Sequence, residues 1–201
     1  MKLLTTETRK VEQKTEAAER SKIELAKKQI EIDERSEVVN TDLARAEPAL
    51  IAAQSSVNGV SSKDIKELQS YINPSANIKL GLESCIALVK NMNTAPNWKT
   101  QVITALKAPG FKESVLSFEK EDISPKCKKF IIDTYISQDA YNIPAFYRSS
   151  KALGPLAEWT KSIIEFADIY ERIAPMREEL LQLEQEKNDM VGEMELLTAE
   201  I

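Results

Sequence analysis

The sequence predicts an all-α protein, in which an antiparallel two-stranded coiled-coil stalk carries a small helical globular domain at its tip. Only five of the 201 residues are glycine and 29% are charged, a composition typical of long solvated helices. Apolar residues recur with a seven-residue period at both ends of the chain, as they do in coiled coils. Sustained strand-like alternation is absent, so helices are expected between these ends as well.

The N-terminal arm, residues 1–48, has one regular apolar column and one irregular column. The regular column repeats every seven residues and consists of Leu4, Val11, Ala18, Leu25, Ile32, Val39 and Ala46. Its companion column is polar until the last two members: Thr8, Thr15, Lys22, Gln29, Ser36, Leu43 and Leu50. Two interpretations remain open. Either the second column has drifted without consequence, or its weak definition lets this arm pair in more than one register.

The C-terminal arm, residues 175–201, continues a more regular apolar seam that begins before it. The seam advances by three and four residues alternately, and Lys187 is its single polar occupant. Its apolar members are Phe166, Ile169, Ile173, Met176, Leu180, Leu183, Met190, Met194, Leu197 and Ile201. A narrow stripe that persists for about five heptads favours a coiled coil over an ordinary amphipathic surface helix.

Each arm contains a proline where a helix interior tolerates it least. Pro48 and Pro175 each remove a backbone hydrogen bond, at a cost of roughly 3 kcal/mol. In an antiparallel hairpin the two prolines would lie at similar heights. We therefore predict that they mark the junction between stalk and head, which divides the chain into residues 1–48, 49–174 and 175–201.

The head, residues 49–174, is predicted to be a set of short helices. Ser61 and Asp64 have the spacing of a capping box, and Ser124 before Pro125 is typical of a helix start. The final long helix is expected to start near Pro155. Further helices are expected within residues 75–91, 97–107, 111–118 and 143–153.

Several classes of function lack their usual residues. The chain has no histidine and no phosphate-binding glycine motif, so we expect neither catalysis nor a bound cofactor or metal. Cys85 and Cys127 are expected to be buried free thiols. No apolar run reaches 18 residues and the N-terminus does not resemble a signal peptide, so no membrane association is expected.

The charge distribution separates the head from the C-terminal part of the chain. Residues 61–151 contain 13 Lys and Arg against 9 Asp and Glu, whereas residues 152–201 contain 4 against 12. A basic head on an acidic stalk suits binding to an acidic polymer, because opposite charge raises the rate of encounter. Solvated lysines scattered without a binding role are the simpler alternative.

A series of motifs in order resembles the stalk and microtubule-binding head of dynein heavy chains. The series comprises Pro48 in "EPALIAAQ", Asn73-Pro74, Trp98, "RSSKALGPLAEW" at residues 148–159, and Pro175 in "RIAPMREEL". The resemblance covers nearly the whole chain and is closer to cytoplasmic than to axonemal members. It implies a fragment of a cytoplasmic, microtubule-associated motor. Its partners would then be the tubulin surface and the rest of the heavy chain, whose ATPase ring would signal along the stalk by sliding one arm against the other.

The resemblance also implies which residues contact the microtubule. The first head helix docks on the track in this family and here carries Lys63 and Lys66, while Arg148 matches an arginine of the last head helix. The weaker candidates are Lys107, Lys126, Lys128, Lys129 and Lys151. Two positions that are acidic in some cytoplasmic members, and temper their binding, are here Ala52 and Pro144.

Two other functions fit parts of the sequence. A passive coiled-coil scaffold whose helical head binds another protein would need the same arms, but its head lysines would matter no more than its stalk lysines. A nucleic-acid-binding helical arm is disfavoured by the isoelectric point near 5.1 and by the lack of a basic stripe along the coil. We therefore expect no nucleic-acid partner.

Overall fold

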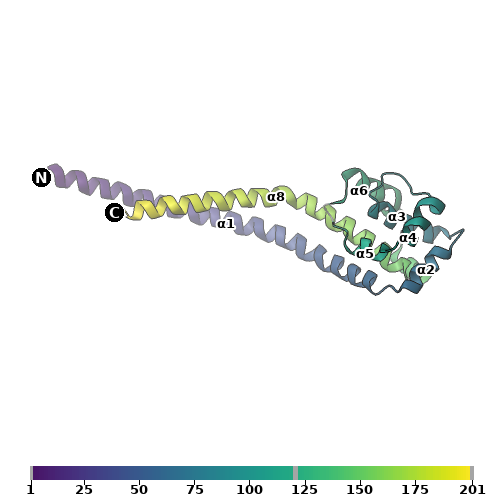
Figure 1. Ribbon diagram of the computed structural model, residues 1–201. Helices are drawn as coiled ribbons and strands as arrows, with labels where there is room; N and C mark the ends of the chain where they lie inside the picture. Colours follow the sequence, from purple (N-terminus) through teal and green to yellow (C-terminus); the bar gives the residue numbers. More distant parts are fainter. Residues whose placement is uncertain (1, 120–121, 200–201) are drawn as a thin grey trace. The chain divides into compact units, whose positions relative to one another are not determined.

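The computed structural model describes the backbone of residues 2–119 and 122–199, and the side chains of residues 8–119, 122–196, 198 and 199. All regular structure in this part of the chain is helical, which confirms the predicted all-α class (Figure 1). The chain forms two compact units. The first combines Met1–Leu43 with Glu171–Ile201, and the second is Ala44–Tyr170. The predicted role of Pro48 and Pro175 as the stalk–head junction stays a prediction.

The first unit consists of portions of two long helices, α1 (Lys2–Asn58) and α8 (Leu153–Ala199). Both helices continue through their prolines, so Pro48 and Pro175 are interior residues of α1 and α8. Ion pairs join Lys28 to Glu186 and Arg35 to Glu179. Residue numbers rise along α1 as they fall along α8, so the two helices pair antiparallel, as predicted for the stalk.

The apolar columns predicted from the heptads are buried in part, and the predicted seam residue Met176 is 39% exposed. Ile32, Val39 and Ile173 are buried, whereas Ile23 and Ile30, outside the columns, are more than half exposed. Toward the N-terminus the regular column is less covered, since Val11 is 45% exposed. The seam residue Leu4 has no described side chain, nor does Leu197, and Ile201 lies outside the described residues.

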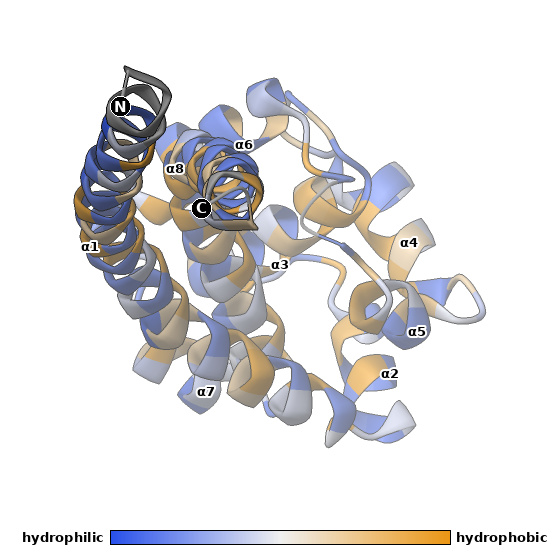
Figure 2. Cartoon of the chain, turned by 90° about the vertical axis from the view of Figure 1, so that its left-hand side faces the viewer, coloured by the Kyte–Doolittle hydropathy of each residue, from blue (hydrophilic) through white to orange (hydrophobic). Residues whose placement is uncertain are grey.

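The second unit packs short helices around the C-terminal part of α1 and the N-terminal part of α8 (Figure 2). In chain order these helices are α2 (Ser62–Ser70), α3 (Ala76–Val89), η1 (Trp98–Val102), α4 (Ile103–Lys107), α5 (Phe111–Leu116), α6 (Pro125–Ile131), η3 (Ile132–Ile136) and α7 (Ile143–Ser149). The final long helix starts at Leu153, two residues before Pro155, close to the predicted position.

The core of the second unit forms around α3 and the first turns of α8. The side chain of Trp159 is fully buried and packs edge-on against Phe118, with ring centroids 5.8 Å apart. Gly81 allows α3 to approach α8, because a Cβ atom there would lie 3.0 Å from Cδ1 of Leu153. Cys85 and Cys127 are buried free thiols, as predicted.

Two predicted helices each contain a π-helical turn that the sequence pattern did not indicate. In η1 the Val102 N–H donates to the carbonyl oxygen of Asn97 at 3.1 Å, a separation of five residues. At the end of η3 the Ser137 N–H donates to Ile132 in the same way, at 3.0 Å. Each such bond accommodates one more residue than an α-turn, which rotates the following side chains around the helix axis.

Candidate functional site

The short helix α2 carries the first two predicted microtubule-binding lysines. Ser61 caps it, because its Oγ accepts a hydrogen bond from the Asp64 N–H at 3.2 Å and the Asp64 carboxylate accepts one from the Ser61 N–H at 3.2 Å. This confirms the predicted capping box. Leu68 is fully buried and anchors the inner face of the helix, while Lys63 and Lys66 are exposed.

The capping residue Asp64 lies within the electrostatic field of two predicted site lysines. The hydrogen bond with the Ser61 side chain holds the pKa of Asp64 below its usual value of 3.8, and the positive charges of Lys151 and Lys63 lower it further. Lys151 follows α7, far from α2 in sequence. Its positive charge therefore acts on the start of α2.

Contacts on the other side of α2 fix its position against α4 and η1. The Gln69 side-chain amide donates to the carbonyl oxygen of Leu106 at 2.7 Å. The Trp98 indole N–H donates to the carbonyl oxygen of Tyr71 at 3.0 Å, just beyond the end of α2. Lys107, the last residue of α4, is exposed directly after the residue that α2 contacts.

The predicted arginine lies on α7. The side chain of Asn142 caps this helix by accepting a hydrogen bond from the Ala145 N–H at 3.0 Å, and the fully buried Phe146 anchors it in the core. Arg148 is exposed in the last turn and makes no ion pair with any residue that the structure describes. We call the five predicted residues on α2, at the end of α4 and at or just after the end of α7 the α2 surface: Lys63, Lys66, Lys107, Arg148 and Lys151.

The remaining three predicted lysines lie on α6, which Figures 1 and 2 both place apart from α2. Lys126 is exposed in the first turn of α6. Lys128 pairs with Asp168 of α8 at 3.2 Å, with 16% of its side chain exposed, and Lys129 pairs with Asp133 at 3.4 Å. The structure therefore separates Lys126, Lys128 and Lys129 from the α2 surface, and their binding role stays a prediction.

One lysine that the sequence did not single out holds the connection between α1 and α2. The Lys112 ammonium group on α5 donates to the carbonyl oxygens of Asn58 and Val60, the latter at 3.0 Å. A cation at the C-terminal end of a helix satisfies carbonyl groups that have no partner within the helix. Nothing in the local sequence around Lys112 indicates this contact, because its partners lie more than 50 positions away.

Burial raises the pKa of several ionisable groups in the second unit. Burial raises the pKa of the Cys85 thiol to about 12 and that of the Cys127 thiol to about 11. Burial likewise raises the pKa of Glu83, which is half-buried on α3. Within the described residues, the side chains of His, Cys, Asp and Glu form no group of three that would hold a metal ion. None of the described helices has the length and apolar character needed to cross a membrane.

The whole chain is similar to one part of known motor proteins. A family model described as the microtubule-binding stalk of dynein motor matches residues 1–200. The cytoplasmic dynein heavy chain of Paramecium tetraurelia is 32% identical over 190 residues, which are 94% of this chain. That of Drosophila melanogaster is 32% identical over 187 residues, or 92% of this chain. The chain spans only 4% of the length of these relatives.

The family match covers both the paired arms of the first unit and the helices that form the α2 surface. It agrees with the order of motifs from Pro48 to Pro175. On these grounds, the chain belongs to the family of microtubule-binding stalks of dynein motors.

Proposed function

We propose that this chain binds the acidic outer surface of the microtubule through the α2 surface. We also propose that its paired arms relay the nucleotide state of a motor ring, outside this chain, by a change in register. The observation that carries the first proposal is that α2, which bears Lys63 and Lys66, contacts α4 beside Lys107 and feels the charge of Lys151, in a chain with a net charge of −5. Such a local positive patch attracts an acidic polymer although the whole chain is negative.

The relay proposal is supported by the asymmetry of the two arms. The α8 seam is apolar except at Lys187, whereas the second α1 column presents Gln29 and Ser36, which line a groove together with Lys187. Polar side chains at the contact bind a neighbouring helix less firmly than apolar ones. A shift of one helical turn, about 5 Å, would therefore lose little buried apolar area.

Co-sedimentation with polymerised microtubules at several salt concentrations tests the binding proposal. We expect Arg148→Glu to lower the affinity by about tenfold or more, because it reverses a charge at a desolvated interface. We expect binding of the unmodified chain to weaken as salt rises. Arg20→Glu is the matched control, since Arg20 is an exposed α1 residue whose side chain is 81% accessible. Equal losses for the two variants would contradict the proposal and favour the scaffold function.

The same assay tests the relay when the arms are crosslinked. A disulfide between Ile32→Cys and Lys187→Cys fixes the present register, because both residues line one groove, and one between Ile32→Cys and Val191→Cys fixes a register four residues away. We expect the two crosslinked chains to differ in microtubule affinity. Identical affinity in both registers would rule out the relay and leave the binding proposal intact.

A further inference from the structure

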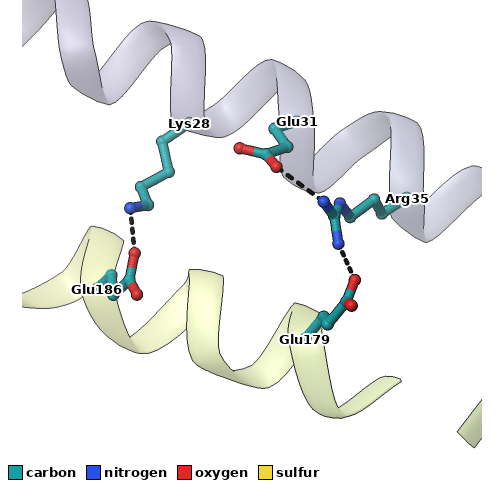
Figure 3. A network of polar contacts seen from close by, with 5 residues as sticks. All are labelled: Lys28, Glu31, Arg35, Glu179 and Glu186. Carbon is teal, nitrogen blue, oxygen red and sulfur yellow. Dashed lines mark hydrogen bonds and ion pairs between the residues drawn. The ribbon is translucent and has the colours of Figure 1, made fainter. Parts of the chain in front are cut away.

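The two arms are joined by ion pairs that repeat with the heptad (Figure 3). Lys28 pairs with Glu186 and Arg35 with Glu179, seven residues forward on α1 and seven back on α8. Another seven residues along, Asp42 pairs with Arg172 at 2.9 Å. We call these three pairs the charge ladder. All of its members lie in the first unit, so the ladder describes the pairing of the arms alone.

The charge ladder is not uniform in sign. At the first two rungs the basic residue belongs to α1 and the acidic residue to α8, whereas at the third rung Asp42 on α1 faces Arg172 on α8. Arg35 is further held by Glu31 on its own helix at 3.0 Å, which orients its guanidinium group toward the partner arm (Figure 3). The reversal gives each register a different set of charge contacts.

The apolar column of α1 cannot by itself choose among registers that differ by a whole heptad. Leu25, Ile32 and Val39 recur every seven residues, so a slip of seven residues again places apolar side chains against the α8 seam. The same slip moves the charges into new pairs. In one direction Arg35 would face Arg172, and in the other Asp42 would face Glu179. Like charges opposite each other are destabilising.

We infer that the reversed third rung, Asp42 with Arg172, selects the present register against slips of a whole heptad. Each pair is partly exposed, and exposed pairs contribute little to total stability. Their role here is different, because registers with similar apolar contacts are distinguished by their charges. With uniform signs, all three rungs would remain attractive when the arms slip by seven residues toward Glu193, as Lys28 would then face Glu193 and Arg35 would face Glu186.

A slip of one helical turn, unlike a slip of a whole heptad, does not bring like charges of the ladder opposite each other. Four residues along α8 from Glu186, Glu179 and Arg172 lie Met190, Leu183 and Met176, so a one-turn shift in that direction breaks the rungs without opposing like charges. The ladder thus penalises whole-heptad slips while leaving the one-turn shift accessible. This last step rests on the proposed relay, whereas register selection itself does not.

Disulfide trapping in the full chain tests the selection directly and needs no microtubules. Ile32→Cys is combined with one of three partners: Lys187→Cys, which lines one groove with Ile32, reports the present register, and Met194→Cys and Leu180→Cys report the two heptad slips. We expect the unaltered ladder to crosslink with Lys187→Cys alone. Exchanging the third rung by Asp42→Arg with Arg172→Asp keeps composition and net charge and should raise both slipped crosslinks by about fivefold or more.

A milder variant gives a directional test that does not depend on the double exchange folding well. Asp42→Asn removes the like-charge contact with Glu179 but leaves that between Arg35 and Arg172. It should therefore raise the crosslink with Met194→Cys more than the crosslink with Leu180→Cys, because Arg35 still opposes Arg172 in the second slip. The inference is overturned if both variants crosslink as the unaltered ladder does, or if the unaltered chain already crosslinks equally with all three partners. Circular dichroism verifies that each variant retains its helices.

Discussion

At the scale of single residues, the tightest constraint lies where α7 meets the start of α8. The ring of Tyr147 lies over Gly154, and a Cβ atom at this glycine would be 2.4 Å from Cγ of that ring. The ring cannot move away freely, because the Tyr147 hydroxyl donates to Glu158 at 2.5 Å. The glycine therefore lets α7, which carries Arg148, pack closely on α8.

We expect Gly154→Ala to lower the free energy of unfolding by about 1–3 kcal/mol, since the methyl group has no room. Gly192→Ala is the control on the same helix. A Cβ atom there has nothing within 4 Å, so the change should leave stability unaltered or raise it by about 0.5–1 kcal/mol. Thermal unfolding followed by circular dichroism compares the two. A similar shift in melting temperature for both would show that the contact with Tyr147 is easily relieved.

At the scale of elements, the N-terminal cap of α2 depends on the ionisation of one carboxyl group, that of Asp64. Because the pKa of Asp64 is lowered in the folded chain, the charged carboxylate favours folding. Its contribution is present above pH 3.8, the ordinary value, and is lost as the pH falls through the lowered pKa of the folded state. The cap is thus fully formed near neutral pH.

Two substitutions separate the causes of this shift. Ser61→Ala removes the hydrogen bond that contributes most, so the pKa of Asp64 should rise toward 3.8. Lys151→Met removes only a charge contribution and should raise the pKa by less. Titration of the Asp64 carboxyl carbon by NMR measures both. A larger rise for Lys151→Met would mean that the charge of the α7 end, rather than the cap, dominates the environment of Asp64.

The elements differ in how far local sequence determines them. The caps at Ser61 and Ser124 were predictable because a capping residue and its partner are three positions apart. The π-turns were not, since an inserted residue leaves the apolar pattern of a short helix almost unchanged. For the α2 surface, the sequence predicted which residues belong to it but not where they lie in the fold. That Lys107 and Lys151 lie near α2, while Lys128 is held by Asp168, depends on tertiary contacts between distant segments.

At the scale of the whole molecule, both arms and their antiparallel pairing were predictable, but the register of that pairing was not. The heptads predicted two long helices and their antiparallel partnership, because a strict apolar period persists over many turns. The α1 column satisfies several registers equally well. The observed register depends on the ladder of Lys28, Arg35 and Asp42, whose partners lie more than 125 positions away in the chain.

The prolines test whether the two units communicate through the continuous helices. Pro48 and Pro175 are exposed interior residues of α1 and α8, so replacing either by alanine restores a helix hydrogen bond without opening a cavity. We expect each replacement to stabilise its helix by up to about 3 kcal/mol, measured by thermal unfolding. If the prolines form the stalk–head junction, microtubule affinity should also change several-fold. Higher stability with unchanged affinity would contradict the junction role.

Because the rungs of the charge ladder are evenly spaced, the paired arms of the first unit can be lengthened by whole heptads. Inserting one heptad into α1 and another into α8, each between the rungs at Arg35 and Asp42, would restore every pair and lengthen the paired arms by about 10 Å. The same insertion in one helix alone would shift the register beyond the insertion by seven residues. The length of the paired arms can thus be altered in steps of seven residues, provided that α1 and α8 change together.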